Sequence, residues 1–450
     1  MSHQLSLVLF HSPTGRYMHT WARRESRIEQ LFGLELVRYS AERAEAARFD
    51  GIFLADKVFF DRVGGNPDMS SYEPLTTLGA LSAVTTKLGL IATASTTFTE
   101  PYNLARMLSQ LDFLSNGRVA WNVVTSTDGA ANFQNDLPPK AERYDQAQDS
   151  FEAMTALWDA WADDAVVLDR ENGVWADISK ISQPHYQGRY VQVRDALAMP
   201  RSPQGRPVIV QAGQSPEGMA FAARNADVVF TAQNHLPSAI EFRRRLRELA
   251  AANGRPDGAP RVLPGLLPII AETQAEADDI MGSIADLLPL RVGLNELSTL
   301  LLGADLDGLD LDEPLPVERL KTLEEAAGHS HLGASRYPNM YRLVTEQRPT
   351  LRELVRTSSQ SAGHPVFVGT ATSVADQMQQ WFEAEACDGF MISPPYMPEG
   401  LDAVCDLLVP ELQRRGLFRT EYPGETLRDT LALARPDRRS SGHRTASETR

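Results

Sequence analysis

Short hydrophobic runs alternate along the chain with longer stretches in which apolar residues recur at helical spacing. Runs that are hydrophobic throughout are typical of strands buried on both faces, as in parallel sheets. Eight runs, nearly all of them continuously hydrophobic, are expected to be strands: Leu5 to Phe10, Gly51 to Asp56, Leu88 to Ser95, Arg118 to Val124, Pro207 to Gly213, Ala226 to Phe230, Val262 to Ile270 and Asp388 to Ser393.

The stretches between these runs carry apolar residues three or four positions apart, which predicts helices that pack one face on the strands. Helices are expected over Leu34 to Phe49, Pro74 to Thr86, from near Pro101, and over Tyr144 to Trp161. Eight strands interleaved with helices favour an α/β fold of the (β/α)8 TIM-barrel type over an open sheet.

The spacing of the runs predicts one barrel domain, residues 1–434, with insertions at about 163–206 and 289–365. Long insertions after barrel strands either shape the mouth of the active site or serve oligomerisation, and both readings stay open. Residues 435–450 are polar and contain no aromatic residue, which is typical of a disordered tail.

Charge and composition narrow the class of protein. Lys plus Arg number 44 against 59 for Asp plus Glu, a formal net charge of −15, which argues against a general nucleic-acid binder. No segment is apolar for long enough to cross a membrane, and the start of the chain has no basic region before its short apolar run. We therefore expect a cytoplasmic enzyme without membrane or nucleic-acid partners.

Hydrogen-bonding residues stand where four of the predicted strands end, which is where barrel enzymes keep their active sites. The predicted strand ends carry no cluster of His and carboxylate side chains, which hydrolytic enzymes usually need for catalysis. Such a site suits a bound cofactor that carries the chemistry, although each residue taken alone could simply cap a helix. These residues are Asp56, Ser95 to Thr97, Asn122 with Thr125 and Ser126, and Gln211 to Ser215.

Gly213 and Ser215-Pro216 form a possible phosphate site. Ser followed by Pro is a common helix start, and Gly213 would let the backbone approach a ligand closely. The free N–H groups of a helix start bind phosphate, although capping alone also explains Ser-Pro.

No metal site is expected. His329 and His331 have no Cys or carboxylate nearby at ligand spacing, so a surface loop explains them better.

Several longer segments together resemble one enzyme family. The chain is similar to the bacterial-luciferase-like flavin monooxygenases, in the branch of nitrilotriacetate, EDTA and dibenzothiophene-sulfone monooxygenases. The similarity runs from about residue 5 to residue 430 and lies in RFDGIFLAD (48–56), EPLTTLGALSAVTTKLGLIATASTTFTEPYNLAR (73–106), LDFLSNGRVAWNVVTS (111–126), ERYDQAQDSFE (142–152), HYQGRYVQVRDALAMPRSPQGRPVIVQAGQSPEG (185–218) and FVGTATSVADQM (367–378).

The resemblance implies a two-component monooxygenase dependent on FMNH2 and O2. A separate NAD(P)H:FMN reductase would supply the FMNH2, and a flavin (hydro)peroxide would oxygenate a small organic substrate of xenobiotic or natural-product type. The family pattern places Asp56 and Thr96 beside the isoalloxazine and Asn122, as the catalytic residue, near its N5 edge. Tyr144 and Ser215 would hold the phosphate. By analogy, the protein is expected to be a homodimer or homotetramer.

Lys140 departs from the family pattern. Relatives often carry His four residues before the motif Tyr, where this chain has Lys140. Either side chain can bring positive charge to a phosphate, so we expect Lys140 to bind there; an exposed lysine without a role is the alternative.

Two other functions remain open. A barrel of this family can transfer hydride with the deazaflavin F420, although the WNVVTS and SPQGRPVIVQAGQS segments look like those of the FMN branch. A catalytically silent flavin-binding subunit is the other alternative, and Lys140 is the observation that favours it.

Overall fold

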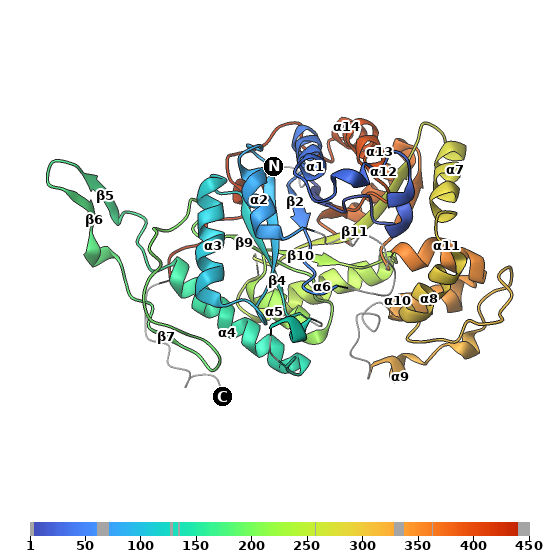
Figure 1. Ribbon diagram of the computed structural model, residues 1–450, viewed down its shortest axis with the longest axis horizontal. Helices are drawn as coiled ribbons and strands as arrows, with labels where there is room; N and C mark the ends of the chain where they lie inside the picture. Colours follow the sequence, from blue (N-terminus) through green and yellow to red (C-terminus); the bar gives the residue numbers. More distant parts are fainter. Residues whose placement is uncertain are drawn as a thin grey trace.

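The computed structural model describes residues 4–60, 72–126, 129–133, 136–256, 258–327, 337–361 and 363–439. Its centre is a closed barrel of eight parallel strands (Figure 1), each paired with the next, with the last paired to the first. The expected TIM barrel is confirmed. Its strands are β1 (Ser6–Phe10), β2 (Gly51–Leu54), β3 (Gly89–Ser95), β4 (Val119–Val124), β9 (Val208–Gln211), β10 (Val228–Thr231), β11 (Arg261–Ile270) and β13 (Gly389–Ile392).

Side chains of each strand alternate between the barrel interior and the surrounding helices. In β1, Val8 and Phe10 join the interior cluster, whereas Leu7 and Leu9 join the cluster formed with the helices. Leu427 and Leu431 also belong to the interior cluster, and Leu427 lies beside Gly89 where β3 begins. They therefore close the amino-terminal end of the barrel and leave its carboxyl-terminal end as the mouth.

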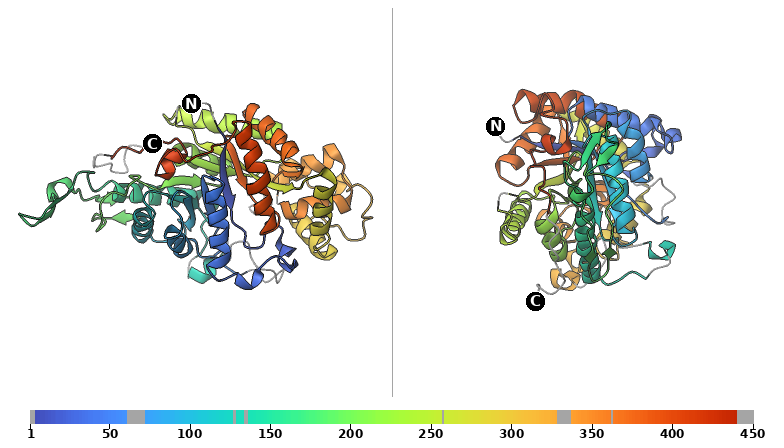
Figure 2. Two further views of the ribbon diagram at one scale, coloured as in Figure 1. Left: turned by 90° about the horizontal axis from the view of Figure 1, so that it is seen from above. Right: turned by 90° about the vertical axis from the view of Figure 1, so that its left-hand side faces the viewer.

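Helices cover the outside of the barrel (Figure 2): α1 (Glu35–Ala46), α2 (Pro74–Ser82), α3 (Pro101–Leu114), α4 (Lys140–Trp158), α5 (Pro216–Asn225), α6 (Leu236–Ala252), α12 (Ala371–Glu383), and the run from α13 (Glu399–Ala403) through η8 (Val404–Leu408) to α14 (Val409–Arg414). The prediction of Tyr144 to Trp161 missed the first turn of α4. The helix starts directly after Pro139, which is its N-cap, and Trp161 instead bridges to Ile181.

A further strand, β12 (Val366–Gly369), was not among the eight predicted. It pairs with Leu267–Ile270, the second half of β11, whereas the first half of β11 pairs with β10. The ten residues of β11 thus pair along one edge first with β10 and then with β12. The sequence VFVG of β12 is only four residues long, too short for its hydrophobic pattern to predict a strand.

The segment between α4 and β9 forms an arm that extends from the barrel (Figure 1). It holds two small antiparallel pairs, β5 (Val166–Asp169) with β6 (Val174–Ala176) and β7 (Tyr186–Gln187) with β8 (Gln192–Val193). Several apolar side chains of the arm are exposed: Val167, Leu168, Val174, Trp175 and Ile178.

A helical unit lies between β11 and β12 and packs around its own hydrophobic cluster. Asn339 Nδ2 donates to the carbonyl of Ala232, 3.1 Å away, which joins this unit to the segment directly after β10. Its elements are α8 (Leu290–Leu300), η5 (Val317–Arg319), α9 (Leu323–Ala327), α10 (Tyr337–Arg342), η7 (Leu343–Gln347) and α11 (Leu351–Ser361), whereas α7 (Gln274–Ala285) packs on β11 and β12.

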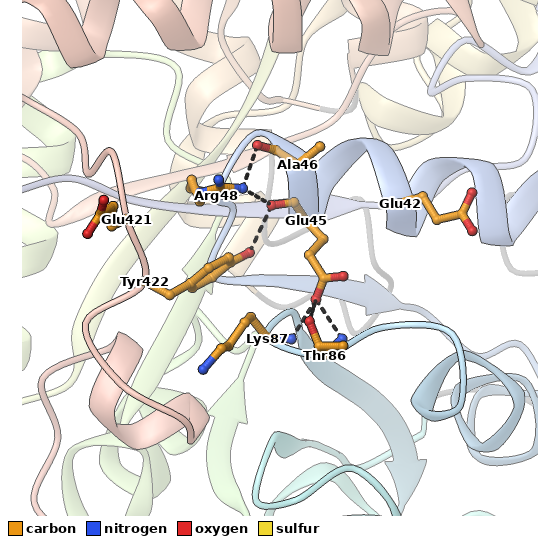
Figure 3. A pocket seen from close by; sticks show the side chains of 8 residues that line it. All are labelled: Glu42, Glu45, Ala46, Arg48, Thr86, Lys87, Glu421 and Tyr422. Atoms are coloured by element: carbon orange, nitrogen blue, oxygen red, sulfur yellow. Dashed lines mark hydrogen bonds between the residues drawn. The ribbon is translucent and has the colours of Figure 1, made fainter.

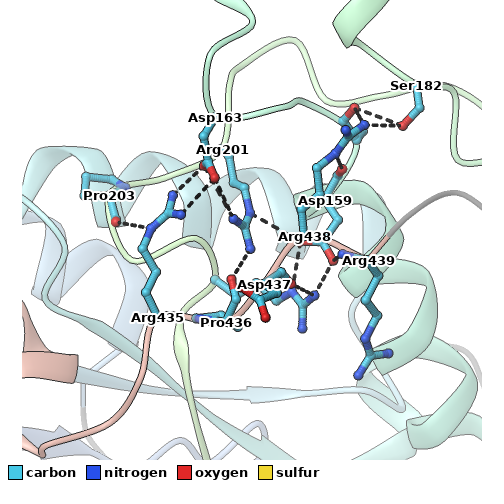
Figure 4. Close-up of polar contacts among 12 residues, drawn as sticks. Asp159, Asp163, Ser182, Arg201, Pro203, Arg435, Pro436, Asp437, Arg438 and Arg439 are labelled. Atoms are coloured by element: carbon cyan, nitrogen blue, oxygen red, sulfur yellow. Dashed lines mark hydrogen bonds and ion pairs between the residues drawn. The ribbon is translucent and has the colours of Figure 1, made fainter.

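The first residues of the expected disordered tail are ordered against the root of the arm (Figure 4). Arg435 pairs with Asp163 at 2.6 Å, and Arg438 Nε donates to the carbonyl of Asp159 at 2.8 Å. The expectation of disorder therefore does not hold for residues 435–439, because arginines anchor them; residues 440–450 lie outside the described residues.

Across the described ranges, no helix is long and apolar enough to span a membrane.

Candidate active site

Three of the predicted site residues stand at the carboxyl ends of neighbouring barrel strands. Asp56 follows β2, Thr96 follows β3, and Asn122 lies near the end of β4. Strands β2, β3 and β4 pair in that order, so the three residues share one side of the mouth. The Thr96 N–H and hydroxyl both donate to the carbonyl of Val124, at 3.0 and 3.1 Å, which ties the ends of β3 and β4 together.

Asn122 is almost fully buried, with 2% of its surface exposed. It lies opposite Thr93 in the strand register, and its Nδ2 donates to Thr93 Oγ1 over 3.0 Å. In the described part of the chain, its Oδ1 has no hydrogen-bond partner. A buried polar atom left in this state is costly, and a ligand that donates a hydrogen bond would satisfy it.

Asp56, which follows the end of β2 in the neighbouring region of the mouth, carries a half-buried carboxyl group. Burial and the negative charge of Glu73 raise the pKa of Asp56 to about 6, although a hydrogen bond from the Lys57 backbone opposes the shift. Asp56 therefore titrates close to neutrality, and its charge at the mouth changes with pH.

Tyr144, Gly213 and Ser215 come together from α4 and the β9–α5 turn to form a small cradle. Ser215 is the N-cap of α5, and its Oγ accepts the N–H of Gly218 at 3.2 Å. A Cβ added to Gly213 would lie 3.0 Å from the Tyr144 hydroxyl, and one added to Gly218 would lie 2.9 Å from it. The two glycines therefore allow the hydroxyl to reach the helix start, as a site for a compact anion requires.

The Tyr144 hydroxyl also connects the cradle to the barrel mouth, because it hydrogen-bonds with Thr125, which follows β4, and with Ser215. Burial raises the pKa of Tyr144, although these hydrogen bonds and Arg143 partly oppose that effect. The side chain therefore stays a neutral hydroxyl that can donate to an anion.

Lys140 stands at the start of α4, one helical turn before Tyr144, and faces the same cradle. Its Nζ lies 3.0 Å from Glu217 Oε2 on the first turn of α5. Both predictions for Lys140, a phosphate-binding side chain or an exposed lysine without a role, stay predictions, because the side chain lies at the cradle and is 42% exposed. Its positive charge is at the cradle, but a carboxylate is bound to it.

Two residues at the end of β1 were not among the predicted site residues. His11 is 2% exposed, and within the described ranges neither of its ring nitrogens has a hydrogen-bond partner. Burial lowers the pKa of His11 to about 3, so the imidazole is neutral. Arg16 places its guanidinium over the ring of Phe10, 5.3 Å from the ring centre. The strand-end rule that found Asp56 would also have found His11, which directly follows Phe10.

An open pocket lies at the opposite end of the barrel (Figure 3), where Glu45 accepts the N–H groups of Thr86, Lys87 and Leu88 just before β3. Its lining mixes acidic and basic side chains and holds none of the predicted site residues. We assign it no part in the chemistry, because barrel chemistry belongs to the carboxyl-terminal mouth.

No group of three or more His, Cys, Asp or Glu side chains suited to a metal ion occurs within the described ranges. His329 and His331 lie outside the described residues.

Comparison with known proteins identifies the family. Residues 15–387 match the family model of luciferase-like monooxygenases. The chain belongs to this family. It is 41% identical to N-acetyl-S-(2-succino)cysteine monooxygenase of Bacillus subtilis (strain 168) over 96% of this chain and 97% of that protein. It is 38% identical to nitrilotriacetate monooxygenase component A of Aminobacter aminovorans, with the same coverage.

A solved structure extends the likeness to three dimensions. EDTA monooxygenase from Chelativorans sp. BNC1 superposes with a TM-score of 0.80 at 30% identity, over 96% of this chain and 99% of that one. The resemblance found in the sequence is thereby confirmed, and this luciferase-like protein is a flavin-dependent monooxygenase.

The residues present fit a flavin phosphate. A neutral tyrosine hydroxyl, a serine hydroxyl, a helix start and a lysine lie close together, in an approach that a Cβ on Gly213 or Gly218 would block. The buried Oδ1 of Asn122, which lacks a partner in the described chain, suits a ring N–H donor.

Proposed function

We propose that this protein is the oxygenase component of a two-component system that uses FMNH2 and O2 to oxygenate a small organic substrate. The observation that carries the proposal is the cradle of Tyr144, Gly213 and Ser215 next to the polar ends of β3 and β4. The cradle's donors suit a phosphate, and the strand ends suit the polar edge of a flavin ring. When bound, the reduced flavin supplies the electrons with which O2 is activated.

The protein's own residues bind and orient in this proposal. Tyr144, Ser215 and Lys140 hold the phosphate, and Gly213 lets the Tyr144 hydroxyl come close to the start of α5. Asn122, positioned by Thr93, accepts a hydrogen bond from the ring near N5 through its unsatisfied Oδ1. Asp56 and Thr96 line the same side of the mouth. The Asn122 amide and the Thr96 hydroxyl are fixed neutral dipoles, which stabilise charge that develops on the ring without giving up a proton.

We infer that the substrate carries carboxylates. The relatives at 41% and 38% identity are named for N-acetyl-S-(2-succino)cysteine and nitrilotriacetate, both of which bear several carboxyl groups. Arg16 supports this inference, because its guanidinium, 8% exposed, stands over an interior ring at the mouth. A guanidinium binds a carboxylate through two parallel N–H donors.

The proposed partners are a separate NAD(P)H:FMN reductase and further copies of this chain. The relative named component A is one part of a multi-component enzyme, which supports the reductase. A homodimer or homotetramer is supported by the exposed side chains of the arm, among them Trp175 at 54% and Ile178 at 81% exposure. Light scattering at several protein concentrations tests the assembly, and a monomer at all of them contradicts it.

The function is tested by supplying FMNH2 from a purified reductase under 18O2. We expect one labelled oxygen atom in the product of N-acetyl-S-(2-succino)cysteine or nitrilotriacetate, and none from uncharged dibenzothiophene sulfone. If the sulfone alone reacts, the inference about carboxylates is wrong while the oxygenase stands. If no compound is labelled and the FMNH2 complex also consumes no O2, the protein is a flavin-binding subunit and the proposal fails.

A further inference from the structure

In the phosphate cradle, the positive charge of Lys140 already has an anionic partner within the protein, the carboxylate of Glu217. The carboxylate of Glu217 forms an ion pair with Lys140 at 3.0 Å. The Ser215 side chain and the Glu217 backbone N–H, in the first turn of α5, also favour the charged form of this carboxylate. A lysine, a serine hydroxyl and a helix-start N–H are the groups expected to bind a flavin phosphate.

These contacts are strong enough to keep the carboxylate charged. Burial of Glu217 disfavours its ionised form, yet the hydrogen bonds from its own N–H, from Lys140 and from Ser215 leave the pKa of Glu217 below its ordinary value. At neutral pH the cradle therefore contains one positive and one negative side chain, and their charges cancel.

We propose that Glu217 is an internal stand-in for the flavin phosphate, which must displace it from Lys140 and Ser215 in order to bind. The inference rests on the proposed use of FMNH2. It assigns Glu217 a role opposite to that of the other cradle residues, because Glu217 weakens the binding of a dianion instead of supporting it.

The exchange is physically easy. The side chains of Lys140 and Glu217 are 42% and 39% exposed, and ion pairs with this much solvent contact contribute little free energy. The glutamate can swing toward solvent while the lysine stays with the phosphate. The remaining cost is repulsion between a carboxylate and a phosphate that carries close to two negative charges at neutral pH.

A lowered affinity suits a flavin that must arrive reduced and leave oxidised in each turnover. Because the repulsion acts on the phosphate alone, it weakens FMN and FMNH2 but leaves binding of the ring system unchanged. Riboflavin, which has the ring and lacks the phosphate, therefore separates the two contributions.

The test is the dissociation constant of FMN, from quenching of flavin fluorescence, and of FMNH2, from anaerobic titration, in the full chain and in Glu217→Gln. We expect the variant to bind both about ten-fold more tightly, since it removes one charge next to a dianion. Riboflavin affinity should stay the same, and FMN affinity should become more sensitive to salt. The matched control is Glu383→Gln, an equal charge change at an exposed residue of α12, which should alter none of these values.

An FMN affinity of Glu217→Gln that is equal to or weaker than that of the original chain, with riboflavin unchanged, overturns the proposal. Equal tightening of FMN and riboflavin also overturns it, because the effect would then not act through the phosphate. If neither the original chain nor the variant binds FMN or FMNH2, the proposed function fails as well, so the two failures are distinguishable.

Discussion

Asn122 and Thr93 face one another across strands β4 and β3, and the Asn122 amide donates to the Thr93 hydroxyl over 3.0 Å. Nδ2 is used by the protein, so Oδ1, buried and without a partner in the described ranges, is the end left to accept from a ligand.

Asn122→Ala should lower the rate of substrate oxygenation on the order of 100-fold, because it removes a dipole set in place before the reaction. Thr93→Val should have a smaller effect, since it frees the amide to rotate but leaves it present. Both rates are measured with saturating FMNH2, and an Asn122→Ala rate within two- to three-fold of the original, on the order of ordinary context effects, would exclude the role near N5.

Tyr144→Phe should weaken FMN binding by about ten-fold, because it deletes a hydrogen bond to a charged group. The aromatic ring at position 144 should stay in place against Phe221, because the centres of the Tyr144 and Phe221 rings lie 6.3 Å apart. Riboflavin affinity is the internal control. If FMN and riboflavin lose affinity equally, Tyr144 holds the ring region or the fold and not the phosphate.

His11 should make the protein less stable in acid. Its pKa is about 3 in the folded chain and about 6.5 when unfolded, so below pH 6.5 only the unfolded chain takes up this proton. The free energy of unfolding should therefore fall from pH 6.5 toward pH 3, with His11 contributing up to about 1.4 kcal/mol per pH unit.

Denaturant unfolding at several pH values checks this expectation. His11→Leu should flatten the slope between pH 6.5 and 4, whereas His185→Gln, a change at an exposed histidine of the arm, should retain it. An unchanged slope in His11→Leu would mean that the imidazole gains a proton in the folded chain as easily as in the unfolded one.

Asp159 should be critical for the fold near the arm (Figure 4). It is 3% exposed and pairs with Arg201 and Arg206, whose side chains are 1% and 10% exposed. Asp159→Asn leaves the buried guanidinium of Arg206 without its counter-charge and leaves Arg201 paired with Asp163 alone, so the free energy of unfolding should fall by about 3–5 kcal/mol. Asp164→Asn, at an exposed residue nearby, should have little effect; equal losses in both variants would contradict the assignment.

The sequence could predict the barrel and most of its mouth because both follow from short-range pattern. The run from Leu5 to Phe10 is hydrophobic except at Ser6 because β1 is covered on both faces, and residues that follow such runs lie at the mouth. The pairing of Lys140 with Glu217 could not be predicted, because it joins the first turns of two helices 77 positions apart in the numbering. The ion pair between Arg435 and Asp163 could not be predicted for the same reason, because the polar composition of residues 435–450 does not indicate a partner far away in the sequence.

The central claim is that the cradle and strand ends bind reduced FMN for oxygen chemistry. The most direct measurement is an anaerobic titration of the protein with FMNH2, oxidised FMN and reduced F420, followed by rapid mixing of each complex with oxygenated buffer and a carboxylated substrate. We expect FMNH2 to bind in preference to the other two and the substrate to be oxygenated within one turnover. Binding of reduced F420 in place of FMNH2, without consumption of O2, would contradict the proposed function, although the assignment of the barrel fold would still hold.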